Sequence, residues 1–294
     1  MADKEQIHTG YDEFELTPEL RRRAEEFRIA DVHCHIYPEK IAVKATKSIA
    51  SFYNLDYEQE MYSKCGDAPT LLANGGAIGC SRYVVCSVAT STSQVDSINR
   101  FIAEECGKHP EFVGLGAWYP DIEDIDALLD QIQALGLRGV KIHPDIQGVD
   151  IDDPKLLSLY SALSERGLVA LIHMGDPRSD HSAPSKLAKV LERFDDLKVD
   201  AAHFGGWCRW DEAYSCLRGS QAYYDLSSSI PSLGIEKASE IAHGYGADRI
   251  MFGCDFPMWN HAAEFYRTLQ LGFSDDELQG IFYGNFARLY GIDD

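Results

Sequence analysis

The stretch IADVHCHIYPEK, residues 29–40, places two histidines one residue apart at the end of a short apolar run. Such a run is typical of a buried strand that passes into a loop. Because successive side chains of a strand point to opposite faces, residues i and i+2 share a face. We therefore expect His33 and His35 to converge on one side, together with Asp31. The opposite face would carry Val32 and Cys34. Two convergent imidazoles are half of a metal site.

Eight apolar runs of this kind alternate with helical patterns along the chain. They are IADVHC (29–34), YVVCSV (83–88), FVGLGAW (112–118), RGVKIH (138–143), LVALIH (168–173), KVDAAH (198–203), AYYDLS (222–227) and RIMFGC (249–254). Nearly continuous apolar strands, each followed by a helix, are typical of the (β/α)₈ TIM barrel, an α/β fold of about 250 residues. An open doubly wound sheet would carry a glycine fingerprint after the first strand, where this chain has histidines.

The pattern predicts one domain over residues 1–294. The first repeat is longer than the others, and we expect residues 38–80 to form a helical insertion that covers the barrel as a lid. Residues 274–294 are expected to form helices that close the barrel.

The net charge of −20 argues against nucleic acid or an anionic membrane as a partner, because both would repel the chain. No apolar run approaches the length of a membrane span, and the N-terminal residues lack the apolar core of a signal peptide. The eight cysteines form no CxxC pair, which favours buried reduced thiols over a disulfide framework. We expect a cytoplasmic protein that binds a small-molecule substrate.

Chemically active side chains gather at one end of the predicted barrel. Barrel enzymes carry their chemistry at the C-terminal ends of the strands. Five of the ten histidines fall at such ends, and Asp255 follows the last strand. These five are His33, His35, His143, His173 and His203. Imidazole and carboxylate are ligands that suit Zn²⁺, Mn²⁺ or Fe²⁺, so the sequence predicts a metal site at this rim.

The ordered motifs DVHCH, VKIHP, LIHMG, AHFGGW, FGCDFP and GNFARLYG resemble the amidohydrolase superfamily. The similarity is closest to its amidohydrolase-related branch, which includes aminocarboxymuconate-semialdehyde decarboxylase, and it covers residues 29–291. The resemblance implies that His33, His35, His173 and Asp255 are the metal ligands, and that His203 acts on the substrate without binding the metal tightly. It also implies one divalent ion, with Zn²⁺ preferred over Mn²⁺ or Fe²⁺, and a homodimer.

Four further residues are candidate substrate contacts. Lys141 either binds or orients an anion, bridges two metals as a carboxylated lysine, or forms a structural ion pair. Three roles remain open for His143, namely a substrate contact, a weak metal ligand and a hydrogen-bond donor at the strand end. Arg178 would clamp a substrate carboxylate or form a surface salt bridge. Trp207 would line a pocket for a planar substrate or simply pack under a loop.

Two reactions fit this ligand set. The first is hydrolysis of an amide, lactone or ester-like bond by a metal-activated water, with Asp255 taking the proton and His203 stabilising the oxyanion or positioning the water. The alternative is non-oxidative decarboxylation of an aromatic or unsaturated carboxylic acid, in which Asp255 or His203 would move the proton. A third reading is a barrel that keeps metal for structure or sensing. The histidine that remains beyond a complete ligand set favours an enzyme, and we predict the hydrolase.

Overall fold

The strands of this protein form a parallel barrel. The computed structural model describes residues 14–292, so positions 1–13 and 293–294 of the predicted domain lie outside the described residues. The strands are β1 (Ile29–His35), β2 (Cys80–Cys86), β3 (Phe112–Gly114), β4 (Gly116–Ala117), β5 (Gly139–Ile142), β6 (Val169–Ile172), β7 (Lys198–Ala201), β8 (Tyr223–Asp225) and β9 (Ile250–Met251).

Within each of two runs, β1-β2-β3 and β4-β5-β6-β7-β8-β9, every strand pairs in parallel with the next one in the chain. Only Leu115 separates β3 from β4, and its N–H donates to Val85 O at 2.9 Å. Val32 N–H donates to Phe252 O at 3.1 Å, which links β1 to the residues that follow β9. The prediction of a TIM barrel is confirmed, with the third predicted strand present as β3 and β4.

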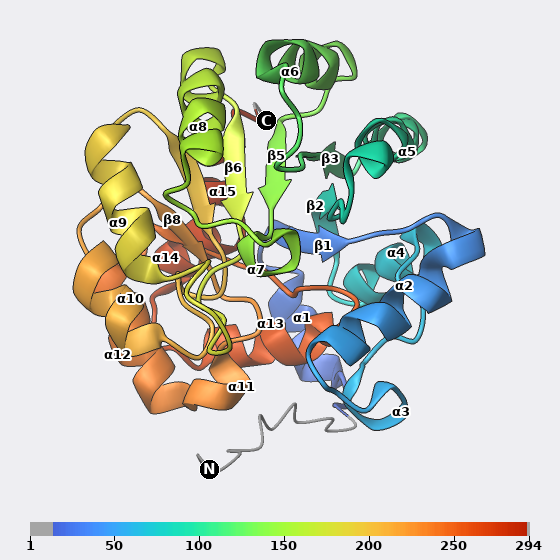
Figure 1. Cartoon of the computed structure of the whole chain (residues 1–294). Helices are drawn as coiled ribbons and strands as arrows, with labels where there is room; N and C mark the ends of the chain where they lie inside the picture. The colour runs from blue at the N-terminus through green and yellow to red at the C-terminus, as the bar shows by residue number, and fades with distance from the viewer. Residues whose placement is uncertain (1–13, 293–294) are drawn as a thin grey trace.

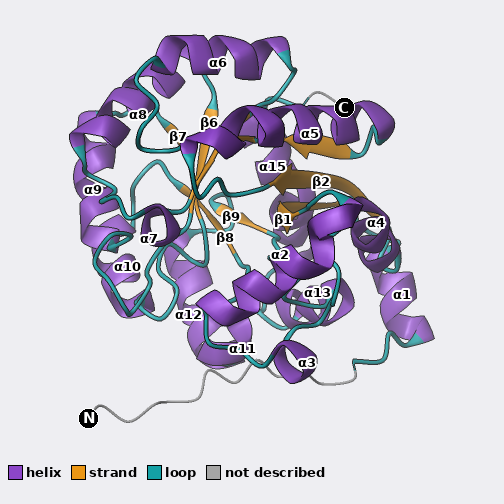
Figure 2. Cartoon of the chain, turned by 45° about the vertical axis from the view of Figure 1, so that its right-hand side comes forward, coloured by secondary structure: helices purple, strands orange, loops and turns teal. Residues whose placement is uncertain are grey.

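Helices surround the strands (Figure 2). They are α1 (Pro18–Ala24), α2 (Glu39–Phe52), α3 (Tyr57–Glu60), α4 (Ala68–Gly76), η1 (Thr92–Gln94), α5 (Val95–Lys108), α6 (Ile125–Ala134), α7 (Pro144–Gln147), α8 (Pro154–Arg166), α9 (Pro184–Arg193), α10 (Trp210–Leu217), α11 (Ile230–Leu233), α12 (Ile235–Tyr245), α13 (His261–Leu269), α14 (Asp275–Gln279), the π-helical η2 (Gly280–Gly284) and α15 (Asn285–Tyr290). None of the helices in residues 14–292 is long and apolar enough to cross a membrane.

Local sequence explains where several of these helices begin and end. The Thr17 side chain accepts a hydrogen bond from Leu20 N–H at the start of α1, and Asp153 caps α8 in the same way. Such caps satisfy backbone donors that a helix end leaves without partners. Gly167 ends α8 with φ of 63°, a left-handed conformation that glycine adopts without steric cost.

Two segments extend the repeating pattern. Helices α2, α3 and α4 lie between β1 and β2, within the predicted insertion, and Figure 1 shows them grouped beside β1. At the other end of the chain, Tyr283, Phe286 and Tyr290 pack against a cluster of small and branched side chains that includes Val32 and Leu171. Side chains of the C-terminal helices thus pack against the apolar interior of the barrel.

Strand β1 departs from strict alternation. Its pairing with β2 is regular at Asp31–Tyr83 but shifts before Cys34–Val85, which marks a bulge. As a result Val32 belongs to the interior cluster, and Asp31 instead meets His261 of α13. The prediction that Asp31 shares the face of His33 and His35 is therefore wrong. A bulge inserts an extra residue, so side chains beyond it change faces.

Candidate metal centre

Two histidines of β1 and the aspartate after β9 converge at the end of the barrel. Asp255 Oδ1 lies 3.6 Å from His33 Nε2 and 3.5 Å from His35 Nε2. One ligand atom from each of the three side chains lies within 4.8 Å of the other two. Asp255 and His203 both adopt left-handed backbone conformations, with φ of 56° and 62°. Such conformations are uncommon outside glycine and concentrate at functional sites.

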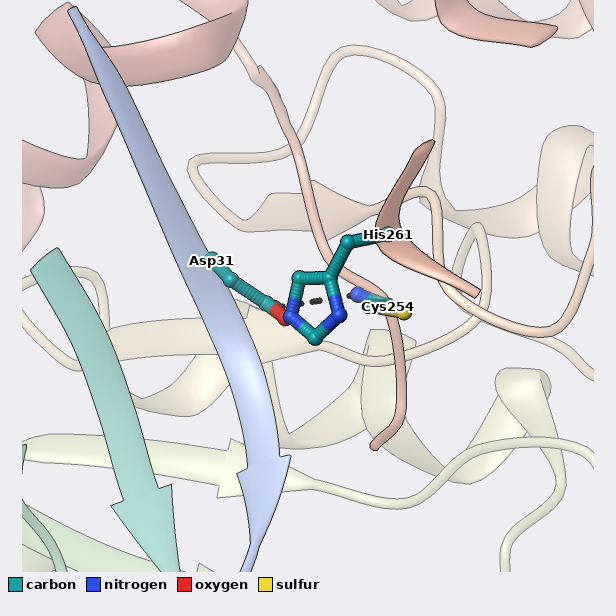
Figure 3. Close-up of side chains that lie close together, drawn as sticks. All are labelled: Asp31, Cys254 and His261. Atoms are coloured by element: carbon teal, nitrogen blue, oxygen red, sulfur yellow. Dashed lines mark hydrogen bonds and ion pairs between the residues drawn. The ribbon is translucent and has the colours of Figure 1, made fainter. Parts of the chain in front are cut away.

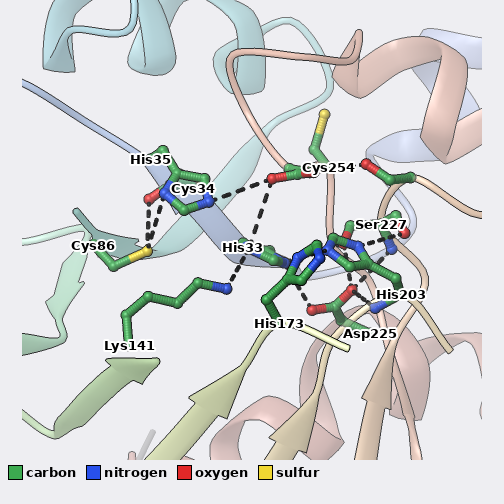
Figure 4. Close-up of polar contacts among 12 residues, drawn as sticks. His33, Cys34, His35, Cys86, Lys141, His173, His203, Asp225, Ser227 and Cys254 are labelled. Atoms are coloured by element: carbon green, nitrogen blue, oxygen red, sulfur yellow. Dashed lines mark hydrogen bonds and ion pairs between the residues drawn. The ribbon is translucent and has the colours of Figure 1, made fainter. Parts of the chain in front are cut away.

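The far side of the His33 ring is held by Asp225 of β8. His33 Nδ1 lies 2.9 Å from Asp225 Oδ2, and Lys141 Nζ lies 2.9 Å from His33 Nε2 (Figure 4). Since an ionised carboxylate can only accept, His33 Nδ1 carries the proton and its Nε2 presents a lone pair. This pairing of a carboxylate with an imidazole is what a metal-ligating histidine has in known sites, and a metal bound at Nε2 would take the place of the Lys141 contact.

His203 and His173 continue this hydrogen-bonded network. His203 Nδ1 lies 3.1 Å from Ser227 O, a carbonyl that can only accept, so this nitrogen donates. His203 Nε2 is then the acceptor for His173 Nδ1, 3.1 Å away. Burial lowers the pKa of His203 to about 4 and holds the pKa of His173 well below its usual value. Both rings are therefore neutral near pH 7, and His173 Nε2 keeps a lone pair.

That nitrogen has no hydrogen-bond partner within residues 14–292 although it is buried. It lies 4.0 Å from Asp145 Oδ2, which also has no hydrogen-bond partner there. His173 therefore lies beside the cluster of His33, His35 and Asp255 but belongs to a second group, with His143 and Asp145.

His143 joins the site to the inserted helices. Its ring stacks on that of His173 at a centroid distance of 3.9 Å. His143 Nδ1 accepts from Ile146 N–H and caps α7, so Nε2 donates to the Tyr53 hydroxyl oxygen at 2.8 Å. Tyr53 ends α2, and its hydroxyl hydrogen remains available to another acceptor.

Serine and tryptophan side chains orient Asp255. Its Oδ2 accepts from Ser228 Oγ at 2.6 Å, and Ser228 Oγ accepts from Trp259 Nε1 at 2.8 Å. Burial by itself would raise the pKa of Asp255, but the facing His33 and His35 hold this pKa well below its usual range. Asp255 is therefore an ionised carboxylate whose Oδ1 faces both imidazoles.

The other three candidate substrate contacts, Lys141, Arg178 and Trp207, contact side chains around the site. Lys141 is fully buried and contacts His33. Arg178 pairs with Asp176 and lies over the Phe52 ring. Trp207 packs edge-on against Tyr53 at a centroid distance of 5.2 Å. Neither Arg178 nor Trp207 lines the cavity at the site.

Sequence reasoning missed Asp225, Ser228 and Tyr53. Asp225 had a signal, because it falls near the end of the predicted strand 222–227. Ser228 had a weaker one, since it directly follows that strand. Tyr53 lies outside the repeating pattern, in the insertion, where no periodicity points to the site.

A cavity of about 560 Å³ opens above these groups. Its floor is formed by polar residues, namely His35, His143, His173, His203 and Asp255. Its walls are largely apolar, and α2 supplies much of them, with Ile41, Ile49 and Phe52. Lys44, which is exposed, is the one lysine or arginine among the described residues that line it. A concave apolar site with a few convergent polar groups is typical of small-molecule binding.

The donor set fits a divalent metal. Two imidazole nitrogens and a carboxylate oxygen, each fixed by a second residue, match the ligand types of Zn²⁺ and its neighbours. These three ligands leave coordination positions for a further protein ligand and for water or substrate.

Comparison with known proteins agrees with this architecture. The family model described as Amidohydrolase matches residues 30–292. An uncharacterized TIM-barrel protein from Bordetella bronchiseptica is 20% identical, with a TM-score of 0.74 over 90% of this chain and 99% of that one. A dihydroxybenzoic acid decarboxylase from Polaromonas sp. JS666, solved with manganese and 2-nitroresorcinol, is 14% identical, with a TM-score of 0.70 over 91% and 98%.

A protein from Pseudomonas putida assigned as a 2-pyrone-4,6-dicarboxylic acid hydrolase is 19% identical, with a TM-score of 0.65 over 91% of this chain and 99% of that one. At these identities the structural likeness supports the fold alone. The family model, in contrast, spans nearly all of the described residues, and on that ground the chain belongs to the amidohydrolase family.

Proposed function

We propose that this protein is a metal-dependent hydrolase that cleaves an amide, lactone or ester-like bond in a small molecule. The observation that carries the proposal is the convergence of His33 Nε2, His35 Nε2 and Asp255 Oδ1 next to the cavity that His35 and Asp255 line. Family membership supports an enzyme, and the structures of similar fold include a protein assigned as a hydrolase.

His33, His35 and Asp255 would hold the metal, and His173 would supply a fourth ligand through its unpartnered Nε2. We propose one ion at this site, with Zn²⁺ preferred over Mn²⁺ or Fe²⁺. A divalent metal bound there would lower the pKa of a bound water toward about 7 and polarise a carbonyl group.

The protein's own groups then have distinct roles. Asp255, held ionised, would accept the proton of the attacking water while Ser228 fixes the orientation of the carboxylate through Oδ2. His203 donates from Nδ1 to a backbone carbonyl, so its Nε2 is an acceptor. That protonation state argues against donation to an oxyanion. A role in orienting water would require His203 Nε2 to exchange its contact with His173 for a contact with the water. General acid–base groups of this kind contribute about 10²–10⁴-fold to a rate.

The inserted segment would act as the lid of the site. Helix α2 supplies apolar wall residues, and the free hydroxyl hydrogen of Tyr53 faces the same region as His143. We propose that Tyr53 donates to a polar atom of the substrate. Lys141 would keep His33 oriented, while Arg178 and Trp207 would support Tyr53 rather than touch the substrate themselves.

Decarboxylation of an aromatic carboxylic acid is the second candidate. It is favoured by the aromatic and aliphatic cavity wall together with a single cation, Lys44, at the cavity. The fold is also shared with a decarboxylase of dihydroxybenzoic acid. In that reaction Asp255 or His203 would carry the proton to or from carbon.

Two measurements test the proposal. Metal analysis of the purified protein comes first, followed by assays with amide, lactone and aromatic-acid panels in H₂¹⁸O. Incorporation of ¹⁸O into the product supports hydrolysis, whereas release of CO₂ without incorporation overturns it in favour of the lyase. His203→Ala is expected to lose most turnover and to keep its metal. Loss of metal from that variant would show that His203 is a ligand.

We also propose a cytoplasmic location and a homodimer. All eight cysteines have free thiols, which supports a reducing compartment. The dimer rests on family resemblance and is tested by measuring the mass of the protein in solution.

A further inference from the structure

A second group of metal-ligating side chains lies behind β1, on the opposite side of the strand from the cavity. It consists of Asp31, Cys254 and His261, one ligand atom from each being within 4.8 Å of the others (Figure 3). All three residues are completely buried. The bulge in β1 sends Asp31 to this face, and His261 is the first residue of α13.

The contact between Asp31 and His261 does not have the geometry of a hydrogen bond. Asp31 Oδ2 lies 2.9 Å from His261 Nε2, yet neither atom, nor His261 Nδ1, has a hydrogen-bond partner in the described part of the chain. Two potential ligand atoms that lie close together without the alignment of a hydrogen bond are expected where both face a common cation. Buried polar atoms without partners are rare, because leaving them unpaired costs free energy.

The other carboxylate oxygen of Asp31 accepts two hydrogen bonds from the backbone. Asp31 Oδ1 accepts from His33 N–H at 2.9 Å and from Cys254 N–H at 3.0 Å. These hydrogen bonds fix the carboxylate and aim Oδ2 at His261. They also fix the backbone next to two proposed ligands of the catalytic metal, His33 and Asp255.

Further side chains of metal-binding type lie around this group. Glu264 lies one turn after His261 on α13, is almost fully buried, and has one oxygen without a hydrogen-bond partner within residues 14–292. Its other oxygen pairs with Arg267. The Cys34 thiol lies 3.8 Å from Asp31 O. A bound cation would offset the charge of the buried carboxylate groups.

We propose that Asp31 Oδ2, Cys254 Sγ and a ring nitrogen of His261 bind a second divalent ion, of which Zn²⁺ is the expected one. Thiolate and imidazole ligands favour Zn²⁺ over Mg²⁺ or Ca²⁺, which take oxygen ligands. Binding would release the Cys254 thiol proton to solvent, as metal binding to thiols does. Because the site is enclosed, the ion would be structural and would hold β1, the end of β9 and α13 together.

Cobalt distinguishes the two sites, because only the second contains a thiolate. Protein loaded with Co²⁺ is expected to bind two ions per chain and to show a thiolate-to-cobalt charge-transfer absorption in the near ultraviolet. Cys254→Ser should lose that absorption and half of the metal. His35→Ala should keep the absorption, since it alters only the catalytic site, and this separates a failure here from a failure of the proposed function.

Cys86→Ser is the matched control, because the Cys86 thiol is also buried but lies 3.7 Å from His35 Nδ1 at the first site. Loss of the absorption in this variant, with retention in Cys254→Ser, would overturn the proposal. Wild-type protein that binds one ion and lacks the absorption would also overturn it, and needs no variant to fold. Asp31 and His261 would then be a simple ion pair.

Discussion

Replacement of Asp225 by asparagine tests how the protein prepares His33 for a metal. The Asp225 carboxylate accepts from His33 Nδ1 at 2.9 Å, from His203 N–H at 3.0 Å and from Ser227 N–H at 3.0 Å. The facing His33 holds the pKa of Asp225 below its usual range in spite of burial, so this group is ionised. Asp225→Asn keeps the shape of the side chain and changes one acceptor to a donor.

The backbone contacts of Oδ1 can persist in Asp225→Asn, so the amide NH₂ group would face His33 Nδ1. The ring would then accept at Nδ1 and carry its proton at Nε2, in place of the lone pair that Lys141 Nζ now faces. A protonated Nε2 cannot bind a metal. Loss of such an outer partner typically costs 10–100-fold in metal affinity, which corresponds to about 1.4–2.7 kcal/mol.

The assay is competition with a chromophoric chelator, which measures the Kd of the bound metal. The matched control is Asp200→Asn on β7, where the carboxylate is equally buried but neither oxygen makes a hydrogen bond within residues 14–292. We expect Asp225→Asn to weaken binding at least about 10-fold and the control to leave it unchanged. Equal affinities in wild type and Asp225→Asn would refute the reasoning about the tautomer.

Three further outcomes are expected. Tyr53→Phe removes the hydroxyl next to His143 and should lower kcat/KM about 5–10-fold, the value of one hydrogen bond, with metal content unchanged. Burial raises the pKa of Asp200 well above its usual value, so the contribution of this group to stability falls as pH rises above about 4. The Tm of Asp200→Asn relative to wild type should therefore increase from about pH 4 to about pH 8. Gly139→Ala would place a Cβ 2.0 Å from Val169 O, between β5 and β6. This clash should lower the free energy of unfolding by more than about 3 kcal/mol in a denaturant titration, and a variant as stable as wild type would contradict the packing.

Local sequence patterns were sufficient for the barrel and for much of its polar rim. The eight apolar runs and the helical spacing between them are properties of neighbouring residues, so they predict strands and helices without knowledge of the partners. Histidines at the ends of these runs, such as His33 and His203, follow from the rule that the C-terminal ends of parallel strands meet at one edge. The contacts of His33, His35 and Asp255 agree with that reasoning.

Only the tertiary structure decided which groups face one another. The bulge that turns Asp31 away from His33 arises from pairing with β2, about 50 residues further along the chain. The Asp225 carboxylate reaches His33 from β8, and Tyr53 reaches His143 from an insertion without a repeating pattern. Alternation and periodicity describe separations of two to four residues, whereas these contacts join segments that packing alone brings together.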